Sequence, residues 1–241
     1  MIRIATYNVH RCRGMDRRVS VARIADVVAR LDADVVAVQE VLRAEDGPAT
    51  ADQVAFLADS LGYTFAFNET RKHQGAAFGN ATLSRLPIRF FRDYDISWRR
   101  RERRGCLRTD VEGRAGVILH VFNVHLGTSM FERPHQVGRL LSTEVLNDSS
   151  LRGPRVVMGD FNDWTRSVAA SLMGSAFESV DVRLLGRRRT YPGLLPLLHL
   201  DHFYYDDALR LRTFRLHRSK LALLASDHLP LVAEFELPRR T

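Results

Sequence analysis

Apolar runs typical of strands end repeatedly in carboxylate, amide or imidazole side chains. Asn8 follows the run at 2–7, and Glu40 follows the run at 35–39. His125, and Asp160 with Asn162, come at the ends of two further runs, whereas Asp201 opens another strand and Asp227 with His228 precedes the last one. A sheet fixes groups at strand ends while the loops leave room for a ligand, so these positions favour binding and catalysis.

Each of these groups, taken alone, also has a purely structural explanation. Asn8 fits a simple turn, and Glu40 fits a cap of the segment that follows it. Gly159-Asp160-Phe161-Asn162 fits an Asx-type turn after a buried strand. His125 fits a buried, hydrogen-bonded histidine, and Asp227-His228 fits a loop. The recurrence of such groups at six strand ends is the reason to prefer the functional interpretation.

The types of these side chains limit the metal that they would hold. Carboxylate and amide oxygens, such as those of Glu40 and Asn8, suit Mg²⁺ or Mn²⁺. No thiolate or paired-histidine spacing favours zinc. A hard cation of this kind acts as a Lewis acid on an oxygen atom of a bound ligand.

Alternating and helical periodicities predict the elements that must position these groups. Helices are expected over Val19–Leu31 and Thr50–Leu61, and after Pro134, where Val137, Leu140, Leu141 and Val145 share a face. The expected strands are Ile2–Tyr7, Val35–Gln39, Ala76–Leu83, Arg89–Tyr94, Leu107–Val111, Val117–Val124, Arg155–Gly159, His202–Tyr205 and Leu231–Leu237. Sheets covered by helices in one α/β or α+β domain, residues 1–241, accommodate this series.

Composition indicates a globular protein and excludes a disordered chain or a fibrous repeat. Of the 241 residues, 45% are hydrophobic and 27% are charged. No apolar run reaches the ~18 residues of a membrane span, and residues 1–6 do not begin a secretory signal. We therefore expect a cytoplasmic monomer in which Cys12 and Cys106 are reduced.

The ordered motifs resemble those of the endonuclease/exonuclease/phosphatase superfamily, whose fold is deoxyribonuclease I-like. They run from residue 4 to residue 236, essentially the whole chain. They are Tyr7-Asn8-Val9, Gln39-Glu40, Gly79–Pro87 with Ile88, Asn123-Val124-His125-Leu126, Gly159-Asp160-Phe161-Asn162, Leu200-Asp201-His202 and Ser226-Asp227-His228-Leu229-Pro230. The resemblance implies a four-layer α-β-β-α sandwich of two mixed sheets, with one active site at their shared edge.

The resemblance also implies a role for each group. Glu40 would be the principal metal ligand, with Asn8 and Asp227 nearby. Asp160 and Asn162 would orient or deprotonate the attacking water. Asp201 would hold His228 in one tautomer. His125 would contact the phosphate or protonate the leaving group, and either Asp160 or His228 would be the general base, with His228–Asp201 favoured here because imidazole titrates nearer neutral pH.

Three further residues are candidates for substrate binding. Glu102 would steady His125, Arg104 would clamp a phosphate oxygen, and Asn80 would touch the phosphate. A solvated arginine-rich loop is the alternative for the first two, and a simple turn is the alternative for Asn80.

Departures from the abasic-site endonucleases narrow the comparison. Position 10 is His where those enzymes commonly have Asp, Val41 stands in place of Lys, and Asn123-Val124-His125 replaces a catalytic Tyr followed by Pro-Asn. The chain therefore looks closer to the deoxyribonuclease, sphingomyelinase and phosphatase branches. A formal net charge of +8 and the loop 97–104, with one tryptophan and five arginines, fit nucleic acid or anionic lipid, or a merely solvating loop.

These observations predict a Mg²⁺-dependent (or Mn²⁺-dependent) hydrolase that cleaves a phosphodiester. The alternatives are a phosphomonoesterase acting on a small or lipid phosphate, and a non-catalytic relative that binds nucleic acid or membrane through its arginines. The presence of a suitable residue at every expected catalytic position counts against the last.

Overall fold

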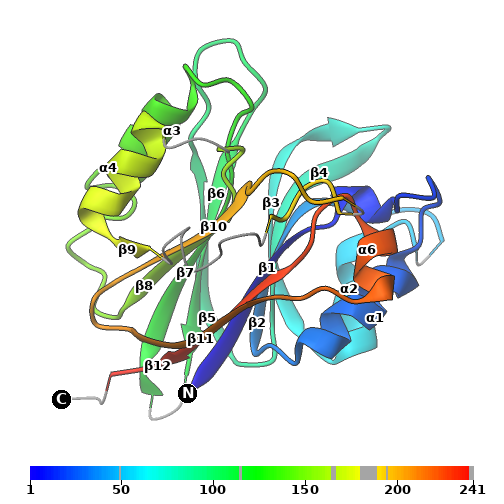
Figure 1. The fold of residues 1–241 in the computed structure, drawn as a ribbon, viewed down its shortest axis with the longest axis horizontal. Helices are drawn as coiled ribbons and strands as arrows, with labels where there is room; N and C mark the ends of the chain where they lie inside the picture. Colours follow the sequence, from blue (N-terminus) through cyan, green and yellow to red (C-terminus); the bar gives the residue numbers. More distant parts are fainter. Residues whose placement is uncertain (49, 114–115, 164–166, 180–188, 194, 239–241) are drawn as a thin grey trace.

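Two six-stranded sheets pack face to face in the computed structural model, which describes residues 1–48, 50–113, 116–163, 167–179, 189–193 and 195–238 (Figure 1). The first sheet has the order β11-β12-β1-β2-β4-β3. Its strands are β1 (Ile2–Asn8), β2 (Val35–Arg43), β3 (Thr64–His73), β4 (Ala76–Ser84), β11 (Arg210–Leu216) and β12 (Leu231–Glu236). Only β1 and β2 pair in parallel within it.

The second sheet has the order β5-β6-β7-β8-β10-β9. Its strands are β5 (Ile88–Asp95), β6 (Gly105–Glu112), β7 (Ile118–His125), β8 (Arg155–Asp160), β9 (Glu178–Ser179) and β10 (Asp201–Tyr205). The parallel pair here is β7 with β8. Each sheet is therefore mixed, with one central parallel pair whose carboxyl ends reach the same edge.

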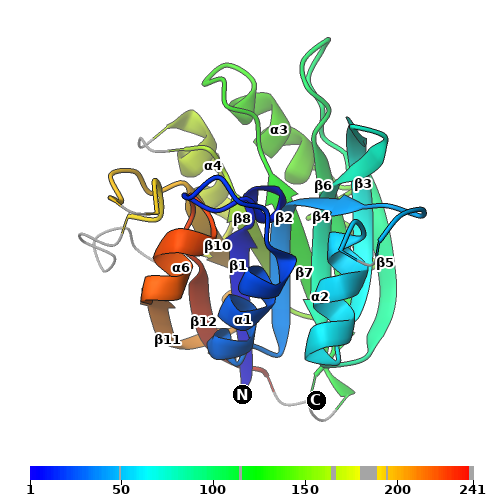
Figure 2. The same cartoon turned by 90° about the vertical axis from the view of Figure 1, so that its right-hand side faces the viewer.

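Helices cover the outer face of each sheet (Figure 1), and Figure 2 looks onto those of the first sheet. The first sheet packs against α1 (Val21–Leu31), α2 (Gln53–Leu61) and α6 (Lys220–Ala225), and the second against α3 (Arg133–Leu140) and α4 (Val168–Ala176). This confirms the predicted four-layer α-β-β-α sandwich. Among the helices described, none is both long and apolar enough to cross a membrane.

The layer between the sheets is apolar at one end and polar at the other. Strand alternation sends Leu119 and Val121 of β7 into this layer, and two residues further on the same face of β7 carries Asn123 and then His125. In β8 the inward positions Val156 and Met158 are followed by Asp160. The other inward positions that become polar are Thr6 and Asn8 on β1 and Gln39 on β2. The polar end of the inter-sheet layer is thus where the strand-end groups meet.

A β-bulge in β2 is fixed by Asn123 from the opposite sheet. Pairing of β2 with β4 shifts between Val38 and Val41. Asn123 is fully buried, and its Nδ2 donates to the carbonyl oxygens of Val38 (3.1 Å) and Ala81 (2.9 Å). Its Oδ1 accepts from Gln39 Nε2 at 2.8 Å. One amide therefore satisfies backbone groups beside the bulge and joins the two sheets at their polar end.

Most elements lie where the periodicities predict them, and each omission has a physical cause. All nine expected strands and the three expected helices are present, with ends shifted by a few residues. Two missed strands, β3 and β11, stand at the two edges of the first sheet, where one face is exposed and charged side chains break the alternation. The third, β9 at the edge of the second sheet, has only two residues and is too short to show a periodicity. The missed helices α4 and α6 are short and contain several small residues.

The third helix is shorter than its apolar spacing predicts. It ends at Leu140, and Leu141 and Val145 lie in the turns that follow. Leu146 N donates back to Leu140 O at 2.9 Å, and Asn147 Nδ2 donates to Leu141 O at 2.5 Å. These bonds let the chain reverse while Val145 remains buried, so the apolar pattern continues without a helix.

We predict that Asn123→Leu lowers the free energy of unfolding by about 2–4 kcal/mol, because the variant leaves the Val38 and Ala81 carbonyl oxygens buried without a donor. Urea denaturation followed by circular dichroism measures this. Thr82→Val is the matched control, since Thr82 is equally buried and its Oγ1 has no hydrogen-bond partner among the described residues. Equal stability of the two variants would contradict the role given to Asn123.

Candidate active site

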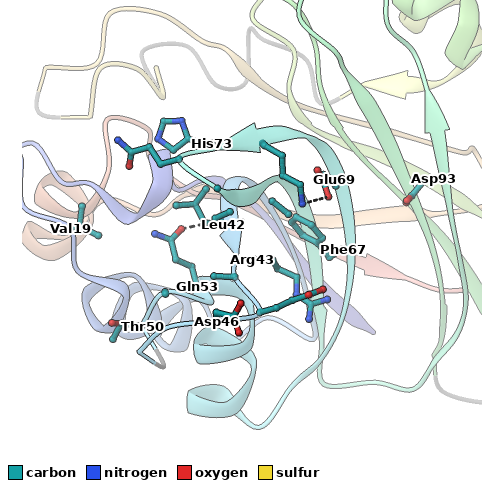
Figure 3. Close-up of a pocket in the computed structure, with 18 residues that line it drawn as sticks. Val19, Leu42, Arg43, Asp46, Thr50, Gln53, Phe67, Glu69, His73 and Asp93 are labelled. Atoms are coloured by element: carbon teal, nitrogen blue, oxygen red, sulfur yellow. Dashed lines mark hydrogen bonds and ion pairs between the residues drawn. The ribbon is translucent and has the colours of Figure 1, made fainter.

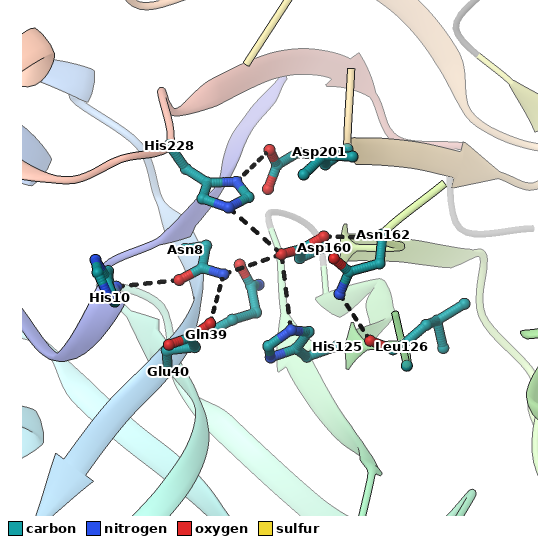
Figure 4. A network of polar contacts seen from close by, with 12 residues as sticks. Asn8, His10, Gln39, Glu40, His125, Leu126, Asp160, Asn162, Asp201 and His228 are labelled. Atoms are coloured by element: carbon teal, nitrogen blue, oxygen red, sulfur yellow. Dashed lines mark hydrogen bonds and ion pairs between the residues drawn. The ribbon is translucent and has the colours of Figure 1, made fainter. Parts of the chain in front are cut away.

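Asp160 lies at the centre of a buried polar network at the shared edge of the two sheets (Figure 4). Its Oδ2 accepts from Asn8 Nδ2 at 3.0 Å and faces His125 Nε2 at 3.7 Å and His228 Nε2 at 3.6 Å. Its Oδ1 accepts from the backbone N–H of Asn162 at 2.8 Å. Strands β1, β7 and β8 and the segment before β12 therefore converge on a single carboxylate.

His228 lies between two carboxylates. Its Nδ1 is 2.9 Å from Asp201 Oδ2, and its Nε2 faces Asp160. Burial opposes a charge on this imidazole, but the negative charges of Asp201 and Asp160 outweigh burial and raise the pKa of His228 to about 10. His228 is thus a cation at neutral pH in the metal-free protein, held in place through Nδ1.

The pKa values of Asp160 and His125 are both shifted in the direction that favours the uncharged form of the side chain. Burial raises the pKa of Asp160 to about 6, although the nearby His228 opposes the shift. Burial, followed by the positive charges of Arg104 and His228, lowers the pKa of His125 well below its ordinary value. His125 is therefore a neutral imidazole beside the carboxylate of Asp160.

The amide of Asn8 has an orientation that its neighbours define. The backbone N–H of His10 can only donate, and it points at 3.0 Å to the Asn8 atom that is therefore the oxygen. Nδ2 then donates to Glu40 Oε1 at 3.3 Å as well as to Asp160. In this orientation Asn8 joins the two carboxylates as a donor, whereas the sequence led us to expect a metal ligand.

Glu40 and Asp227 present the accessible carboxylates of the site. Both line the same cleft and are partly exposed. Glu40 Oε2 lies 3.7 Å from Arg11 Nη1, and Asp227 Oδ1 lies 3.4 Å from His10 Nδ1. Their hard oxygens fit a divalent cation of the Mg²⁺ type, while the only thiols, Cys12 and Cys106, are buried elsewhere in the core.

A second possible ligand set is more deeply buried. One oxygen or nitrogen each of Asp160, Asp201 and His228 lies within 4.8 Å of the others. His228 Nδ1 is already hydrogen-bonded to Asp201, so the same arrangement is equally consistent with a chain of hydrogen bonds that holds no ion.

The cleft that these groups line has a volume of about 410 Å³ and carries three arginines on its walls. Arg104 is buried, its Nη2 donates to Glu102 Oε2 at 2.9 Å, and its Nε has no partner among the described residues. Arg71 donates to the other Glu102 oxygen at 2.8 Å and stacks over the Phe78 ring at 4.0 Å. Arg11 completes the set, which makes the cleft suitable for an anionic group.

Two predicted substrate contacts have different surroundings from those expected. Glu102 lines the cleft but is exposed and pairs with Arg71 and Arg104, and within the described part of the chain none of its hydrogen bonds or ion pairs involves His125. Asn80 is buried, donates to the Gly105 carbonyl at 3.4 Å, and is absent from the cleft lining. Ten of the eleven predicted residues are thus brought together, with Glu102 in the cleft lining and Asn8 and Asp201 beneath the cleft floor.

Sequence reasoning missed Arg11, Arg71 and Tyr191 as cleft residues. Arg11 follows the Asn8-Val9-His10 segment directly, so its proximity was available from the sequence. Arg71 lies on the unpredicted strand β3, and Tyr191, whose ring centroid is 5.0 Å from that of His228, lies in a loop without periodicity. For these two, no signal marks the residue before the fold is known.

Backbone strain is concentrated around the site. His10, Arg11 and Cys12 are three consecutive residues with positive φ (45°, 55° and 57°), and Glu40 and Asn162 have φ of 56° and 49°. The left-handed region costs a non-glycine residue about 1 kcal/mol or more. Ordinary folding gives no reason to accept this cost repeatedly at one edge, so the strain supports a functional role.

The residue directly before Asp160 must be glycine. The φ of Gly159 is 146°, and a Cβ here would lie 1.9 Å from the Val124 carbonyl oxygen of the adjacent strand β7. Only glycine permits this approach, which brings His125 and Asp160 into register across the parallel pair.

A larger cavity, of about 830 Å³, lies on the other side of the β3–β4 hairpin (Figure 3). Its lining mixes the cations Arg43 and Lys72 with the acids Glu45, Asp46 and Glu69. None of the predicted catalytic or metal-binding residues faces it, so size alone does not identify the site.

The chain belongs to the endonuclease/exonuclease/phosphatase family, whose model matches residues 5–228. Members of this family hydrolyse phosphoester bonds. The chain is 34% identical over 254 residues to uncharacterized protein YbhP of Escherichia coli, covering 98% of this chain and 96% of that protein.

Solved structures agree with the fold. An endonuclease/exonuclease/phosphatase from Beutenbergia cavernae is 25% identical with a TM-score of 0.75, covering 98% of this chain and 72% of that one. A mannosyl-6-phosphatase from Bacteroides thetaiotaomicron is 17% identical with a TM-score of 0.78, covering 98% of this chain and 100% of that one. At 17% identity, the similarity to the mannosyl-6-phosphatase shows a shared fold and nothing more.

We predict that Asp201→Asn lowers the pKa of His228 by more than about one unit in the metal-free protein, because a carboxylate that favours the imidazolium is replaced by a neutral amide. NMR titration of the imidazole resonances measures this. His217 is the internal control, because it lies outside the cleft and its pKa, which burial lowers, is expected to stay the same in the variant. An unchanged His228 titration would contradict the arrangement described.

Proposed function

We propose that this chain, as one domain, is a divalent-metal-dependent phosphoester hydrolase that cleaves a phosphodiester. The observation that carries the proposal is the juxtaposition, in one cleft, of the Glu40 and Asp227 carboxylates, the Asp160–His228–Asp201 network and the arginines. Carboxylates alone would repel a phosphate, and arginines alone would bind it without cleaving it. A cation held by the carboxylates resolves this conflict.

In this proposal Glu40 and Asp227 hold Mg²⁺ or Mn²⁺. The bound ion supplies Lewis-acid stabilisation of charge on the phosphoryl group. Asn8 positions Glu40 and Asp160 through its two donated hydrogen bonds, so we assign it a positioning role in place of direct ligation. The side-chain atoms of Glu40 and Asp227 that face the cleft have free lone pairs for this purpose.

In this proposal different side chains activate the water and stabilise the charge on the phosphate. We assign Asp160 as the group that orients and deprotonates the attacking water, with Asn162 fixing it through a backbone N–H. His228, held by Asp201, donates a charge-assisted hydrogen bond to a phosphoryl oxygen. This reverses our sequence-based preference for His228 as base, because an imidazole placed between two carboxylates already holds both of its protons. His125 and Arg104 face the remaining phosphate oxygens from the cleft wall.

Glu40→Gln and His228→Ala are each expected to lower turnover of a bis-aryl phosphodiester at least ~100-fold in the presence of Mg²⁺, because the first removes a metal ligand and the second a hydrogen-bond donor to the phosphate. Steady-state kinetics measures this. Calorimetric Mn²⁺ binding separates the two, since affinity falls in Glu40→Gln and persists in His228→Ala.

Glu69→Gln is the matched control for the loss of a carboxylate. Glu69 is exposed on β3, where its Oε2 pairs with Lys72 Nζ at 3.2 Å, outside the cleft. Turnover near the wild-type level in both Glu40→Gln and His228→Ala would refute the assignment.

A phosphomonoesterase is the second candidate, and the three arginines of the cleft favour it. A monoester carries one more negative charge than a diester near neutral pH, so three guanidinium groups suit it well. We expect para-nitrophenyl phosphate to be hydrolysed more slowly than its bis-substituted diester with Mg²⁺, and neither to be hydrolysed in EDTA. Faster hydrolysis of the monoester would select the second candidate.

The non-catalytic alternative predicts a different pattern. Salt-sensitive nucleic-acid binding without metal-dependent turnover of either ester would support it. The cytoplasm remains our predicted location, and the two free, buried cysteines are compatible with it.

A further inference from the structure

Three loops that line the cleft also carry exposed apolar or cationic side chains at their tips. The loop between β7 and α3 contributes Thr128 to the cleft, the loop before β10 contributes Tyr191 and Leu198, and the loop between β5 and β6 contributes Arg104. In Figure 2 the first and third project at the top, and the second, in golden yellow, lies at the upper left. We call these three loops the rim of the cleft.

The rim exposes large apolar side chains that the core does not use. Met130 and Phe131 are 66% and 68% exposed at the tip of the β7–α3 loop, and Leu195 and Leu197 are 67% and 52% exposed in the loop before β10. Single exposed hydrophobic residues are ordinary, but pairs on two loops of one site mark an interaction surface.

Arginines accompany this apolar surface. Arg99, Arg100, Arg101 and Arg103 are exposed in the β5–β6 loop. The Trp98 ring in this loop stacks on His135 of α3, with centroids 4.8 Å apart and planes at 11°. Since His135 follows Phe131 by four residues, the stack holds the basic loop beside the apolar tip. Apolar side chains bordered by arginines are the pattern of a surface that inserts shallowly into an anionic bilayer.

Nucleic acid explains the same residues less well. Base stacking needs an open aromatic face, but Trp98 has His135 on one side and the Arg99 guanidinium 4.6 Å from its ring centroid. Phe131 offers such a face, but Met130, Leu195 and Leu197 do not. The aliphatic share of the rim therefore favours lipid.

We propose that the rim binds an anionic lipid bilayer and holds the cleft against the headgroup layer, so that the substrate is the phosphodiester of a phospholipid headgroup. Binding to the bilayer stands independently of catalysis. The identity of the substrate rests on the proposed function.

The test is co-sedimentation of the full-length protein with vesicles of phosphatidylcholine, with or without phosphatidylglycerol. The wild type is expected to bind the anionic vesicles more tightly. Met130→Ser/Phe131→Ser and Leu195→Ser/Leu197→Ser are each expected to lower the partition coefficient at least ~10-fold. Arg99→Gln/Arg100→Gln is expected to lower the preference for anionic vesicles on the order of fivefold for each arginine that reaches the headgroups.

Phe90→Ser/Phe91→Ser is the matched control. These phenylalanines are 47% and 54% exposed, but they lie on β5 opposite Asp110 and Thr109, away from the end of the second sheet that carries the site. This variant is expected to bind vesicles as the wild type does. Equal losses in the control and rim variants would overturn the proposal, because they would show non-specific adhesion.

Two further readouts separate lipid binding from catalysis and from other partners. Glu40→Gln is expected to bind vesicles normally, and the rim variants to keep their turnover of a soluble bis-aryl diester while losing turnover of phosphatidylglycerol in vesicles. Vesicle binding with no turnover in the wild type would refute only the substrate. Binding of single-stranded DNA without vesicle binding, or rim-dependent self-association in size-exclusion chromatography, would refute the membrane surface.

Discussion

The active edge of this protein depends on one buried amide. Asn123 reaches from the second sheet to the carbonyl oxygens of Val38 and Ala81 and to the side chain of Gln39. These contacts stabilise a bulge in β2, and the bulge reverses which face of the strand the next residue occupies. Glu40, with its φ of 56°, consequently enters the cleft, whereas regular pleating would place it with Val36 and Val38 against the helices.

The rest of the site occupies the same inter-sheet layer as the hydrophobic core, but with polar side chains at the inward-facing positions. At one end of the inter-sheet space the inward side chains are aliphatic and aromatic, and at the other they are mainly amides, carboxylates and imidazoles. Many of these buried polar groups pair with one another, as in the Asn8–Asp160–His228–Asp201 chain of contacts, although Asp201 Oδ1 has no hydrogen-bond partner among the described residues. The same burial fixes their protonation, since it leaves His125 neutral while two carboxylates keep His228 charged.

The rim of the cleft and its floor are built from different parts of the chain. The ends of the central strands of both sheets supply most of the floor, and the strained residues Arg11 and Asn162 are tied to it by hydrogen bonds with Gln53 and Leu126. The rim comes from loops, where exposed Phe131 and Leu195 contribute nothing to the core. Chemistry and the choice of partner are therefore separable in this molecule, the first belonging to the strands and the second to the loops.

The sequence by itself determined the central strands, the helices with strong periodicity and the order of groups at the strand ends, because alternation and spacing are local properties of the chain. The sequence also contained the strand alternation that places Asn123, His125 and Asp160 on the inward faces of their strands. Edge strands β3 and β11 escaped it, since their exposed faces carry charges that disturb the pattern. Only the tertiary structure decided that Glu40 leaves its expected face, that Asn8 donates to two carboxylates, and that Arg71 reaches the cleft. Those outcomes depend on contacts between segments far apart in the chain, and no local pattern of residues encodes which partner a side chain meets.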